Sequence, residues 1–422
     1  MSDLATAHQL GEYIDATPTP YHAAANGAKL LQSHGFEPFD PTVPCRPGRY
    51  YVCDSGALIA WVDGDNPVAP PRMIAAHTDS PNLRIRPKPD MRSAGIAQLG
   101  VEVYGGALLN SWLDRELGLA GRVAVRNGTR TDVHLIRSEK PLLRIPQLAI
   151  HLDREINDRG LQLDRQRNLN PIWSLERPDL PMFRSWLSEQ LACDPESILA
   201  WDMSCFDTQP HQVFGRSDEF IAAARLDNLM SCFAGLEAIS SVSPDVDRPA
   251  VLMLFDHEEV GSSSATGADS ALPSRVLEQR SLTLGIERSQ WLDSLSASVL
   301  LSADMAHGTH PNYVERHEPN HHVILGGGPA IKYNSNARYA SEAATAAEFK
   351  IRCADAGIAV QEYSHRGDLA CGSTIGPILA AQLAVPTVDV GTPQLAMHSA
   401  REMMACADVS ATVSAFTEWL RP

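Results

Sequence analysis

Carboxylate and imidazole side chains are concentrated in five short segments of this chain. In most of these segments the charged and imidazole residues follow an apolar run. The segments are AAHTDSPNLRIRP (75–87), RLDNLMSCFAGLEA (225–238), LFDHEEVGSSSATGA (254–268), LLSADMAHGTHPNY (300–313) and PQLAMHSAREMMACAD (393–408). Oxygen and nitrogen ligands without thiolate are typical of open, catalytic metal sites, whereas closed structural zinc sites are rich in cysteine. The pattern therefore predicts that these residues hold divalent metal ions.

The segment at 254–268 is the most informative of the five. An apolar strand is expected to end at Asp256, followed by Glu258, Glu259 and a turn rich in glycine and serine. Adjacent carboxylates at the end of a buried strand are costly to desolvate unless a cation compensates their charge. Since the two glutamates point in different directions, one can bind metal while the other transfers protons. The alternative is an acidic cluster at a helix N-terminus, which the helix dipole favours.

His77 and Asp227 are weaker candidates when each is taken alone. His77 follows an apolar strand, and Asp79, two residues on, can hold the second ring nitrogen as metal-bound histidines require. The alternative for His77 is a hydrogen-bonded histidine in a turn. Asp227 stands where the chain enters a helix, a position at which a lone aspartate usually caps the helix.

The last two segments allow more than one interpretation. Asp304 ends an apolar strand but is followed by His307 and His310, and the sequence does not choose among the three. His398 precedes a predicted helix, where a single histidine would ordinarily lie at the helix start or on the surface. Taken together, the five segments predict two ions about 3.5–4 Å apart that share one carboxylate.

Alternating helices and apolar strands are expected to position these residues. Helices are predicted over much of residues 1–40 and over 226–240, 337–356, 374–384 and 401–420, and strands at 50–61, 72–76, 249–255, 297–303, 359–363 and 387–390. Such alternation is typical of an α/β sheet covered by helices on both faces, in which ligand sites gather at the carboxyl ends of strands.

The pattern of the chain changes between about residues 93 and 218. Short strands between glycine turns are predicted at 98–104, 121–125 and 132–135, followed by a polar, irregular stretch at 154–181. The alternation of helices and strands is missing there and returns afterwards. The sequence therefore predicts a discontinuous catalytic domain, residues 1–92 and 219–422, that carries a β-rich insertion, residues 93–218.

The bulk composition disfavours several other classes of protein. The chain has 422 residues, a formal net charge of −16 and a pI of about 5.3, which disfavours a general nucleic-acid or anionic-membrane surface. No signal peptide and no apolar run of membrane-spanning length is predicted. The eight cysteines form no CxxC pair, which favours a reducing cytoplasm over a disulfide scaffold.

The segments together resemble the aspartyl aminopeptidase family of two-zinc metallopeptidases. The resemblance rests on seven strings in family order: HTDSPNLRIRP, SWLDRELGLAGRV, RLDNL, DHEEVGS, SADMAHGTHPNY, IKYNSNARYA and MHSARE. It implies a doubly covered, mixed-sheet zinc-peptidase domain of the α/β class with an inserted β-rich dimerisation domain. It also implies a homo-oligomer, a dodecamer built from dimers, and peptide substrates with an acidic N-terminal residue, Asp or Glu.

The resemblance also assigns roles to individual residues. The implied ligands of one ion are His77, Asp227 and Asp304, and those of the other are Asp227, Glu259 and His398. Asp227 would bridge two divalent ions, Zn²⁺ by resemblance, with Co²⁺ or Mn²⁺ as alternatives that the same donors accept. Glu258 resembles the general base that activates the attacking water, and Asp79 resembles the residue that orients His77.

Three further residues are implied to contact substrate. Lys332, in IKYNSNARYA, is the candidate partner of an acidic side chain, and Tyr339 lines the same pocket; a solvated surface lysine is the alternative for Lys332. His151, in QLAIHLDR, resembles a histidine that reaches the site from a neighbouring subunit and stabilises the oxyanion, although spacing alone indicates an ordinary strand histidine. The string NLNPIWSLERPDL at 168–180 departs from the family pattern, which weakens any substrate contact from the insertion.

Two other functions stay open at this point. A two-metal aminopeptidase or deacylase of neutral specificity would use the same ligands. A catalytically silent assembly protein would keep the fold, although every implied ligand and the base are present in this chain. The acidic preference therefore depends on Lys332 and on the resemblance.

Overall fold

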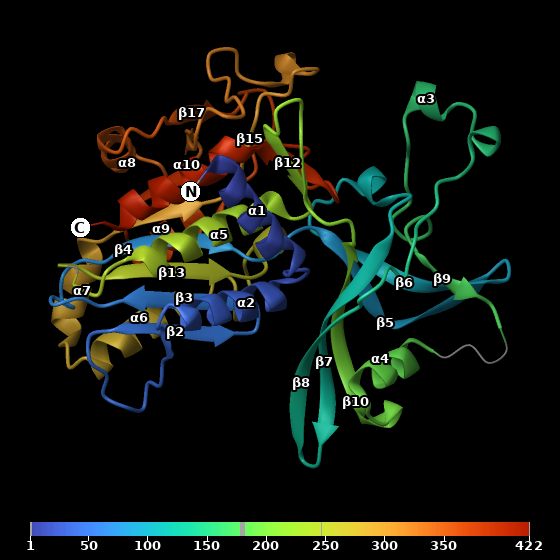
Figure 1. Ribbon diagram of the computed structural model, residues 1–422, viewed down its shortest axis with the longest axis horizontal. Helices are drawn as coiled ribbons and strands as arrows, with labels where there is room; N and C mark the ends of the chain where they lie inside the picture. The colour runs from blue at the N-terminus through green and yellow to red at the C-terminus, as the bar shows by residue number, and fades with distance from the viewer. Residues whose placement is uncertain (1, 178–181, 246, 422) are drawn as a thin grey trace. The chain divides into compact units, whose positions relative to one another are not determined.

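Two compact units make up the chain (Figure 1). The computed structural model describes residues 2–177, 182–245 and 247–421. The first unit consists of Met1–Asp79, His211–Met397 and Glu402–Pro422, and the second of Ser80–Pro210 and His398–Arg401. The first unit contains two sheets and the second unit contains one, and each unit has its own hydrophobic core.

A nine-stranded mixed sheet forms the centre of the first unit, in the order β1-β2-β3-β13-β4-β14-β18-β16-β17. Its strands are β1 (Glu37–Pro38), β2 (Arg49–Asp54), β3 (Ala57–Val62), β4 (Arg72–His77), β13 (Ala250–Phe255), β14 (Val299–Ala303), β16 (Ala330–Tyr333), β17 (Gln361–Ser364) and β18 (Thr387–Gly391). The inner strands β3, β4 and β13 are buried at every residue, as expected for strands covered on both faces.

Helices cover both faces of this sheet, because alternate side chains of a strand point to opposite faces. In β3, Leu58 and Ala60 join one core, while Ile59 and Trp61 join the other. The first core is completed by α1 (Asp3–Asp15), α2 (Pro20–Ser33), α5 (Leu226–Ser241), α8 (Ala343–Asp355) and α10 (Cys406–Leu420), and the second by α6 (Leu272–Thr283), α7 (Arg288–Ser296) and α9 (Ile375–Leu383). The predicted α/β sheet with helices on both faces is confirmed.

Three neighbouring parallel strands bring the ligand-bearing segments to one edge of this sheet. β4 lies between β13 and β14 and runs parallel to both. Phe255, the last residue of β13, pairs with His77, the last residue of β4. Since parallel strands end on the same side, the residues that follow these strands meet there.

A smaller sheet of the first unit has five strands in the order β11-β12-β20-β19-β15. They are β11 (Gln212–Phe214), β12 (Phe220–Ala223), β15 (Ala306–His307), β19 (Pro393–Leu395) and β20 (Glu402–Ala405). β12 leads into the start of α5, and β15 follows the end of β14. The small sheet therefore fixes the chain beside the segments that carry Asp227 and Asp304.

The second unit is built on a six-stranded antiparallel sheet in the order β8-β7-β10-β5-β6-β9. Its strands are β5 (Asn82–Ser93), β6 (Ile96–Tyr104), β7 (Leu117–Asn127), β8 (Arg130–Arg137), β9 (Ile172–Leu175) and β10 (Ile198–Asp207), and α4 (Phe183–Leu191) joins its core. The unit begins at Ser80, before the predicted boundary at residue 93, because β5 pairs with β6 and β10. Its role in dimerisation stays a prediction.

Two predicted helices begin later in the structure than the sequence indicated. The helix predicted at 337–356 begins at Ala343, because the Asp389 carboxylate accepts the Ala340 N–H at 2.5 Å and holds the preceding residues in a loop. The stretch predicted as a helix at 401–420 forms β20 before α10, so the expectation that His398 precedes a helix was wrong.

Two other stretches are more structured than expected. Residues 50–61 form a hairpin of β2 and β3 instead of one strand. The stretch at 154–181, predicted to be irregular, contains α3 (Ile156–Arg159) and β9, and its residues 178–181 lie outside the described residues.

In the described ranges, no helix combines the length and apolar character needed to cross a bilayer.

A buried ion pair provides a test of the first unit's core. Arg280 of α6 donates to the Asp63 carboxylate, with Nε at 2.8 Å, and both side chains are almost fully buried. Asp63→Asn removes the counter-charge of Arg280 and is expected to lower the free energy of unfolding by about 3–5 kcal/mol, measured by denaturant titration. The matched control is Glu278→Gln, also on α6, which breaks an exposed pair with Arg288 of α7 at 2.7 Å and should cost less than about 1 kcal/mol. Equal effects of the two variants would contradict the assignment.

Candidate metal centre

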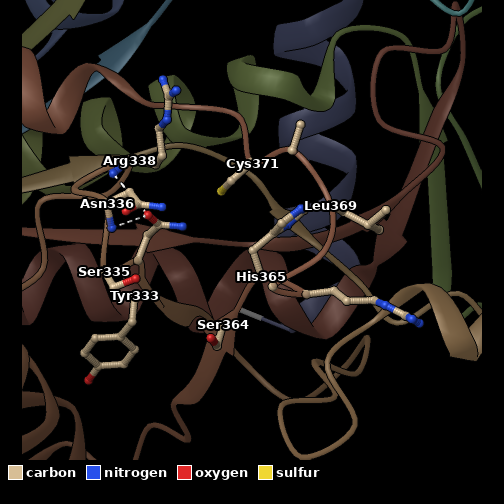
Figure 2. Close-up of a pocket in the computed structure, with 12 residues that line it drawn as sticks. Tyr333, Ser335, Asn336, Arg338, Ser364, His365, Leu369 and Cys371 are labelled. Atoms are coloured by element: carbon tan, nitrogen blue, oxygen red, sulfur yellow. Dashed lines mark hydrogen bonds between the residues drawn. The ribbon is translucent and has the colours of Figure 1, made fainter.

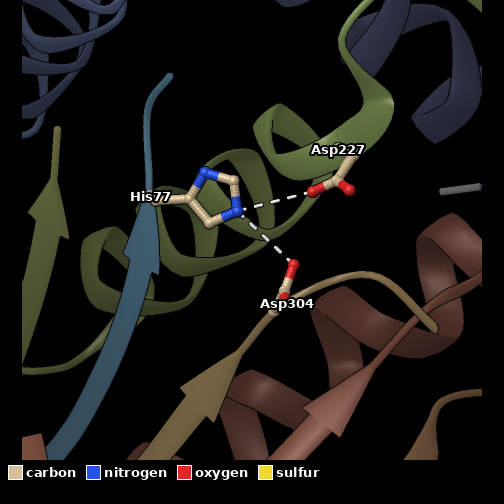
Figure 3. Close-up of side chains that lie close together, drawn as sticks. All are labelled: His77, Asp227 and Asp304. Atoms are coloured by element: carbon tan, nitrogen blue, oxygen red, sulfur yellow. Dashed lines mark hydrogen bonds and ion pairs between the residues drawn. The ribbon is translucent and has the colours of Figure 1, made fainter. Parts of the chain in front are cut away.

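His77, Asp227 and Asp304 come together at the carboxyl edge of the nine-stranded sheet (Figure 3). His77 ends β4, Asp304 directly follows β14, and Asp227 lies in the first turn of α5. The His77 Nε2 atom is 3.4 Å from one carboxylate oxygen of each aspartate. All three residues belong to the first unit, and His77 and Asp227 are buried.

An irregular turn at the start of α5 presents Asp227. Its φ and ψ of −82° and 106° are not helical, and neither are those of Asn228. The Asp227 N–H donates to Glu402 Oε2 at 3.0 Å, and Asn228 Nδ2 donates to the Ala303 carbonyl at 2.8 Å, which ties the turn to the end of β14. The Asp227 carboxylate faces His77, a position that a helix cap alone does not explain.

Asp79 orients this group in two ways. The His77 Nδ1–H donates to the Asp79 backbone carbonyl at 3.0 Å, which places the lone pair of the neutral ring on Nε2. The Asp79 carboxylate accepts the backbone N–H groups of Glu258 and Glu259 at 3.0 and 3.1 Å. The sequence predicted that the carboxylate would orient the ring, but the backbone carbonyl is closer to Nδ1 than the carboxylate, which is 3.4 Å away.

Glu258 and Glu259 lie in a short 3₁₀ helix, η4 (Glu258–Val260), that begins three residues after Phe255, the end of β13. A carboxylate oxygen of Glu259 lies within 4.8 Å of one of Asp227, so Asp227 is close to both His77 and Glu259. Burial raises the pKa of Glu258 to about 8; the charge of His77 opposes this shift, and nearby carboxylates add to it. The acidic cluster predicted at this strand end is therefore present, within a turn of three residues.

The local electrostatics favour a bound cation. Burial lowers the pKa of His77, but hydrogen bonds to Asp227, Asp304 and Asp79 outweigh burial and hold that pKa well above its usual range. A buried cluster of carboxylates is unfavourable unless a cation compensates its charge. The 3.4 Å separations between nitrogen and oxygen also match the spacing of about 3.3–3.5 Å between two ligands of a tetrahedral zinc ion. The residues present therefore fit a divalent metal such as zinc.

His398 belongs to the second unit, in the segment His398–Arg401 between β19 and β20. Its backbone has a φ of 66°, and its Nδ1–H donates to the Gly106 carbonyl at 3.1 Å. This hydrogen bond places the lone pair of the neutral ring on Nε2, the tautomer that a metal ligand needs. The role of His398 as a ligand stays a prediction.

Lys332 of β16 is buried beside Asp304. Its Nζ donates to Asp304 Oδ2 at 3.4 Å and to the Met305 carbonyl at 3.2 Å, and it lies 5.0 Å from the centre of the Tyr339 ring. With a side-chain exposure of 2%, Lys332 is not a solvated surface lysine. The structure thus brings together Lys332, Tyr339 and one of the candidate ligands.

A cavity of about 340 Å³ is lined by Arg338, which precedes Tyr339 in the chain, and by Cys371 (Figure 2). Cys371, which lines the cavity, donates through Sγ to the Tyr339 hydroxyl at 3.5 Å. Arg338, His365 and Arg366 also line it, and none of its described lining residues is acidic. A chain of contacts therefore runs from a cavity wall rich in cationic groups to Tyr339.

The structure separates Asp304 from the two histidines that follow it. Only Asp304 forms a potential metal-binding group with His77 and Asp227 among the residues described. Burial, with help from nearby Lys332 and His365, lowers the pKa of His307 to about 4. His310 instead takes part in its own loop, where its Nδ1 accepts the N–H of Asn312 at 3.2 Å.

His151 lies in the short 3₁₀ helix η2 (Ile150–Leu152) of the second unit and is exposed. The strand position that its spacing indicated was therefore wrong. Its contact with the site of a neighbouring subunit stays a prediction.

Two positioning residues were missed in the sequence. Glu402 accepts the N–H of Asp227, and Cys232 Sγ donates to the His77 carbonyl at 3.0 Å. Glu402 stands in the MHSARE string, but nothing in the sequence shows that it contacts a residue so distant along the chain.

Comparison with known proteins extends these observations to the whole chain. The family model of aminopeptidase I zinc metalloproteases, M18, matches residues 13–420. This chain belongs to the M18 family. Membership makes the protein a metalloaminopeptidase and implies zinc as its metal.

Relatives and solved structures agree with this assignment. A probable M18 family aminopeptidase 2 of Mycobacterium bovis is 45% identical over 430 residues, which cover 99% of this chain and 98% of the relative. The cryo-EM structure of the Ape4 and Nbr1 complex is 35% identical with a TM-score of 0.94, and the match covers 99% of this chain and 86% of that one. The S. cerevisiae mApe1 dodecamer is 25% identical with a TM-score of 0.84, covering 98% and 97%. The predicted family resemblance and fold class are confirmed.

Asp79→Asn tests how the centre is oriented. The carboxylate accepts two backbone N–H groups, whereas an amide would present one acceptor and one donor to them. We expect metal affinity to fall by about 10- to 100-fold, the usual effect of changing a residue that supports a ligand. Competition with a chelator, followed by metal analysis of the protein, measures this change. Glu237→Gln, on α5 but outside the site, is the control, and unchanged affinity in Asp79→Asn would contradict the orienting role.

Proposed function

We propose that this M18 aminopeptidase removes aspartate or glutamate from the N-termini of peptides. The observation that carries the proposal is the buried ammonium of Lys332, beside Asp304 and close to the Tyr339 ring. A buried cation next to the candidate metal ligands can pair with the carboxylate of the first substrate residue. The adjoining cavity adds Arg338 and His365, in contrast to the chain's net charge of −16.

We infer two divalent ions per subunit that share Asp227. One would be held by His77, Asp227 and Asp304, and the other by Asp227, Glu259 and His398. The proximity of Asp227 to both His77 and Glu259 supports this sharing. His398 follows the strand β19 and precedes β20, so the first unit holds the chain on both sides of its segment. Zinc is implied by the family, and Co²⁺ or Mn²⁺ would suit the same donors.

The proposed chemistry is hydrolysis of the first peptide bond. Metal ions bound here would supply Lewis acidity, which polarises the scissile carbonyl and lowers the pKa of a water molecule. Glu258 would accept a proton from the attacking water on its carboxylate and return that proton to the leaving amine. Lys332 and Tyr339 would hold the acidic side chain, and His151 from a neighbouring subunit would donate to the developing oxyanion.

One observation favours a different specificity. The Lys332 ammonium already donates to Asp304, so it can act solely by neutralising a metal ligand. An aminopeptidase or deacylase of neutral specificity would then use the same centre. A catalytically silent assembly protein is the third possibility, and the complete set of ligand-type residues with Glu258 counts against it.

We also propose a cytoplasmic homo-oligomer, a dodecamer built from dimers. The mApe1 dodecamer shares this fold over nearly the whole chain. In the second unit, the edge strand β8 exposes Val133 and Leu135, and the segment around His151 exposes Leu148 and Leu152. Exposed apolar side chains on an edge strand are typical of a surface that another chain covers. The cytoplasmic location is supported by the eight cysteines, none of which forms a disulfide.

Glu258→Gln tests the general base. The amide cannot accept the proton of the attacking water, so we expect the rate to fall at least about 100-fold while bound metal is retained. Chelation of the unmodified enzyme should abolish activity, and re-addition of zinc should restore it. Hydrolysis of aminoacyl substrates and metal analysis of the same samples measure both effects. Full activity in Glu258→Gln, with Glu237→Gln as the control, would contradict the assignment.

Lys332→Met tests the acidic specificity, because methionine keeps the apolar stem and removes the charge. If Lys332 binds the substrate carboxylate, kcat/KM for aspartyl and glutamyl substrates should fall at least about 30-fold relative to leucyl substrates, the effect of losing a buried charge pair. Lys350→Met, which removes an exposed lysine of α8, is the control. Equal losses for acidic and leucyl substrates would show that Lys332 acts only through Asp304.

A further inference from the structure

Two histidines of the first unit meet where α1 approaches β11, on elements that carry none of the candidate ligands described above. His8 lies on α1, and His211 immediately precedes β11. We propose that His8 and His211 form a further binding site for a divalent transition-metal ion of the zinc type. The proposal is independent of the aminopeptidase activity.

The ring nitrogens have the spacing of two ligands of one ion. His8 Nδ1 and His211 Nε2 are 3.4 Å apart, and the rings meet edge to face with an interplanar angle of 71°. This distance is longer than the usual hydrogen bond between nitrogen atoms. Two nitrogens that each lie about 2.0–2.1 Å from a tetrahedral zinc ion are separated by about 3.3 Å. The spacing therefore matches that of two ligands of one ion, and it is long for a direct hydrogen bond.

Asp15 holds His211 as carboxylates hold metal-bound histidines. Its Oδ2 accepts the His211 Nδ1–H at 2.7 Å, and its Oδ1 accepts the His211 backbone N–H at 2.9 Å. Because a carboxylate only accepts, the ring proton lies on Nδ1 and the lone pair lies on Nε2, which points toward His8. A carboxylate behind the ring also raises the basicity of the ligating nitrogen.

The helix makes room for this ring. A Cβ atom at Gly11 of α1 would lie 2.2 Å from two carbon atoms of the His211 ring, so only glycine permits the contact. Glycine weakens the interior of a helix compared with alanine. The close packing of the His211 ring against α1 therefore depends on glycine at position 11.

The site is accessible to an ion and to water. A cavity of about 390 Å³ is lined by both histidines, and Asp218 contributes a carboxylate to its wall. The side chain of His211 is 15% exposed, and His8 is exposed. Two imidazoles with water in the remaining positions would give an exchangeable ion that fastens α1 to the start of β11.

Equilibrium dialysis of the full-length, zinc-loaded protein against buffers of defined free zinc tests the proposal. At micromolar free zinc, the unmodified protein is expected to bind one more ion per chain than His8→Ala, and zinc should raise its Tm but not that of His8→Ala. Asp15→Asn keeps both imidazoles and should weaken this additional binding by about 10- to 100-fold. The control is His34→Ala, which removes an exposed imidazole elsewhere in the unit and should bind as the unmodified protein does.

Aminopeptidase activity should be the same in His8→Ala and the unmodified protein once the catalytic metal is saturated. An equal zinc count in the unmodified protein and His8→Ala would overturn the proposal. The same conclusion would follow if an additional ion survived both His8→Ala and Asp15→Asn, because another site would then hold it. In either case the two histidines would share only a hydrogen bond, and the proposed function would be unaffected.

Discussion

The concentration of negative charge at one edge of the nine-stranded sheet is the constraint on which the rest of the site depends. Parallel strands that end together place their following residues together, and here those residues are largely carboxylates. Such a cluster is stable in a buried place only when cations and hydrogen-bond donors surround it. The backbone N–H groups that bind Asp79 and the ammonium of Lys332 meet part of this requirement, and a bound metal ion would meet the rest.

In the proposed function, Lys332 would connect the metal centre with substrate specificity. Its ammonium is shared between Asp304 and the face of Tyr339, so a substrate carboxylate that approaches it competes with Asp304 for the same charge. A metal ion bound to Asp304 would weaken the ion pair between Asp304 and Lys332, because the ion would neutralise part of the carboxylate's negative charge. Metal binding would therefore release the ammonium for the substrate. The proposed acidic preference would then depend on metal occupancy through one side chain, Lys332.

The sequence predicted those parts of the site that depend on the ends of single strands. Glu259 and Asp304 were plausible from spacing because each follows an apolar run, whereas His77 taken alone was equally an ordinary hydrogen-bonded histidine in a turn. In the structure, Asp304 follows β14, Glu259 lies just after β13, and His77 is the last residue of β4. Contacts between distant segments carried no such signal. The hydrogen bond from Asp227 to Glu402 and the loop that Asp389 holds before α8 depend on residues far apart in the chain. The predicted boundary at residue 93 left β5 outside the insertion for the same reason. β5 belongs to the second unit because it pairs with β6 and β10, and these pairings cannot be read from the sequence of β5 itself.

The first helix also influences the metal centre, although it carries no predicted ligand. Arg225, two residues before Asp227, has a φ of 58°, a left-handed conformation that costs a non-glycine residue about 1–2 kcal/mol. Its guanidinium donates to the carbonyls of Ile14 and Thr17 at the end of α1, at 3.1 and 3.2 Å. These bonds hold Arg225 in the conformation from which the irregular turn begins. The carbonyl groups of Ile14 and Thr17 therefore help to set the direction in which the chain leaves Arg225 toward Asp227.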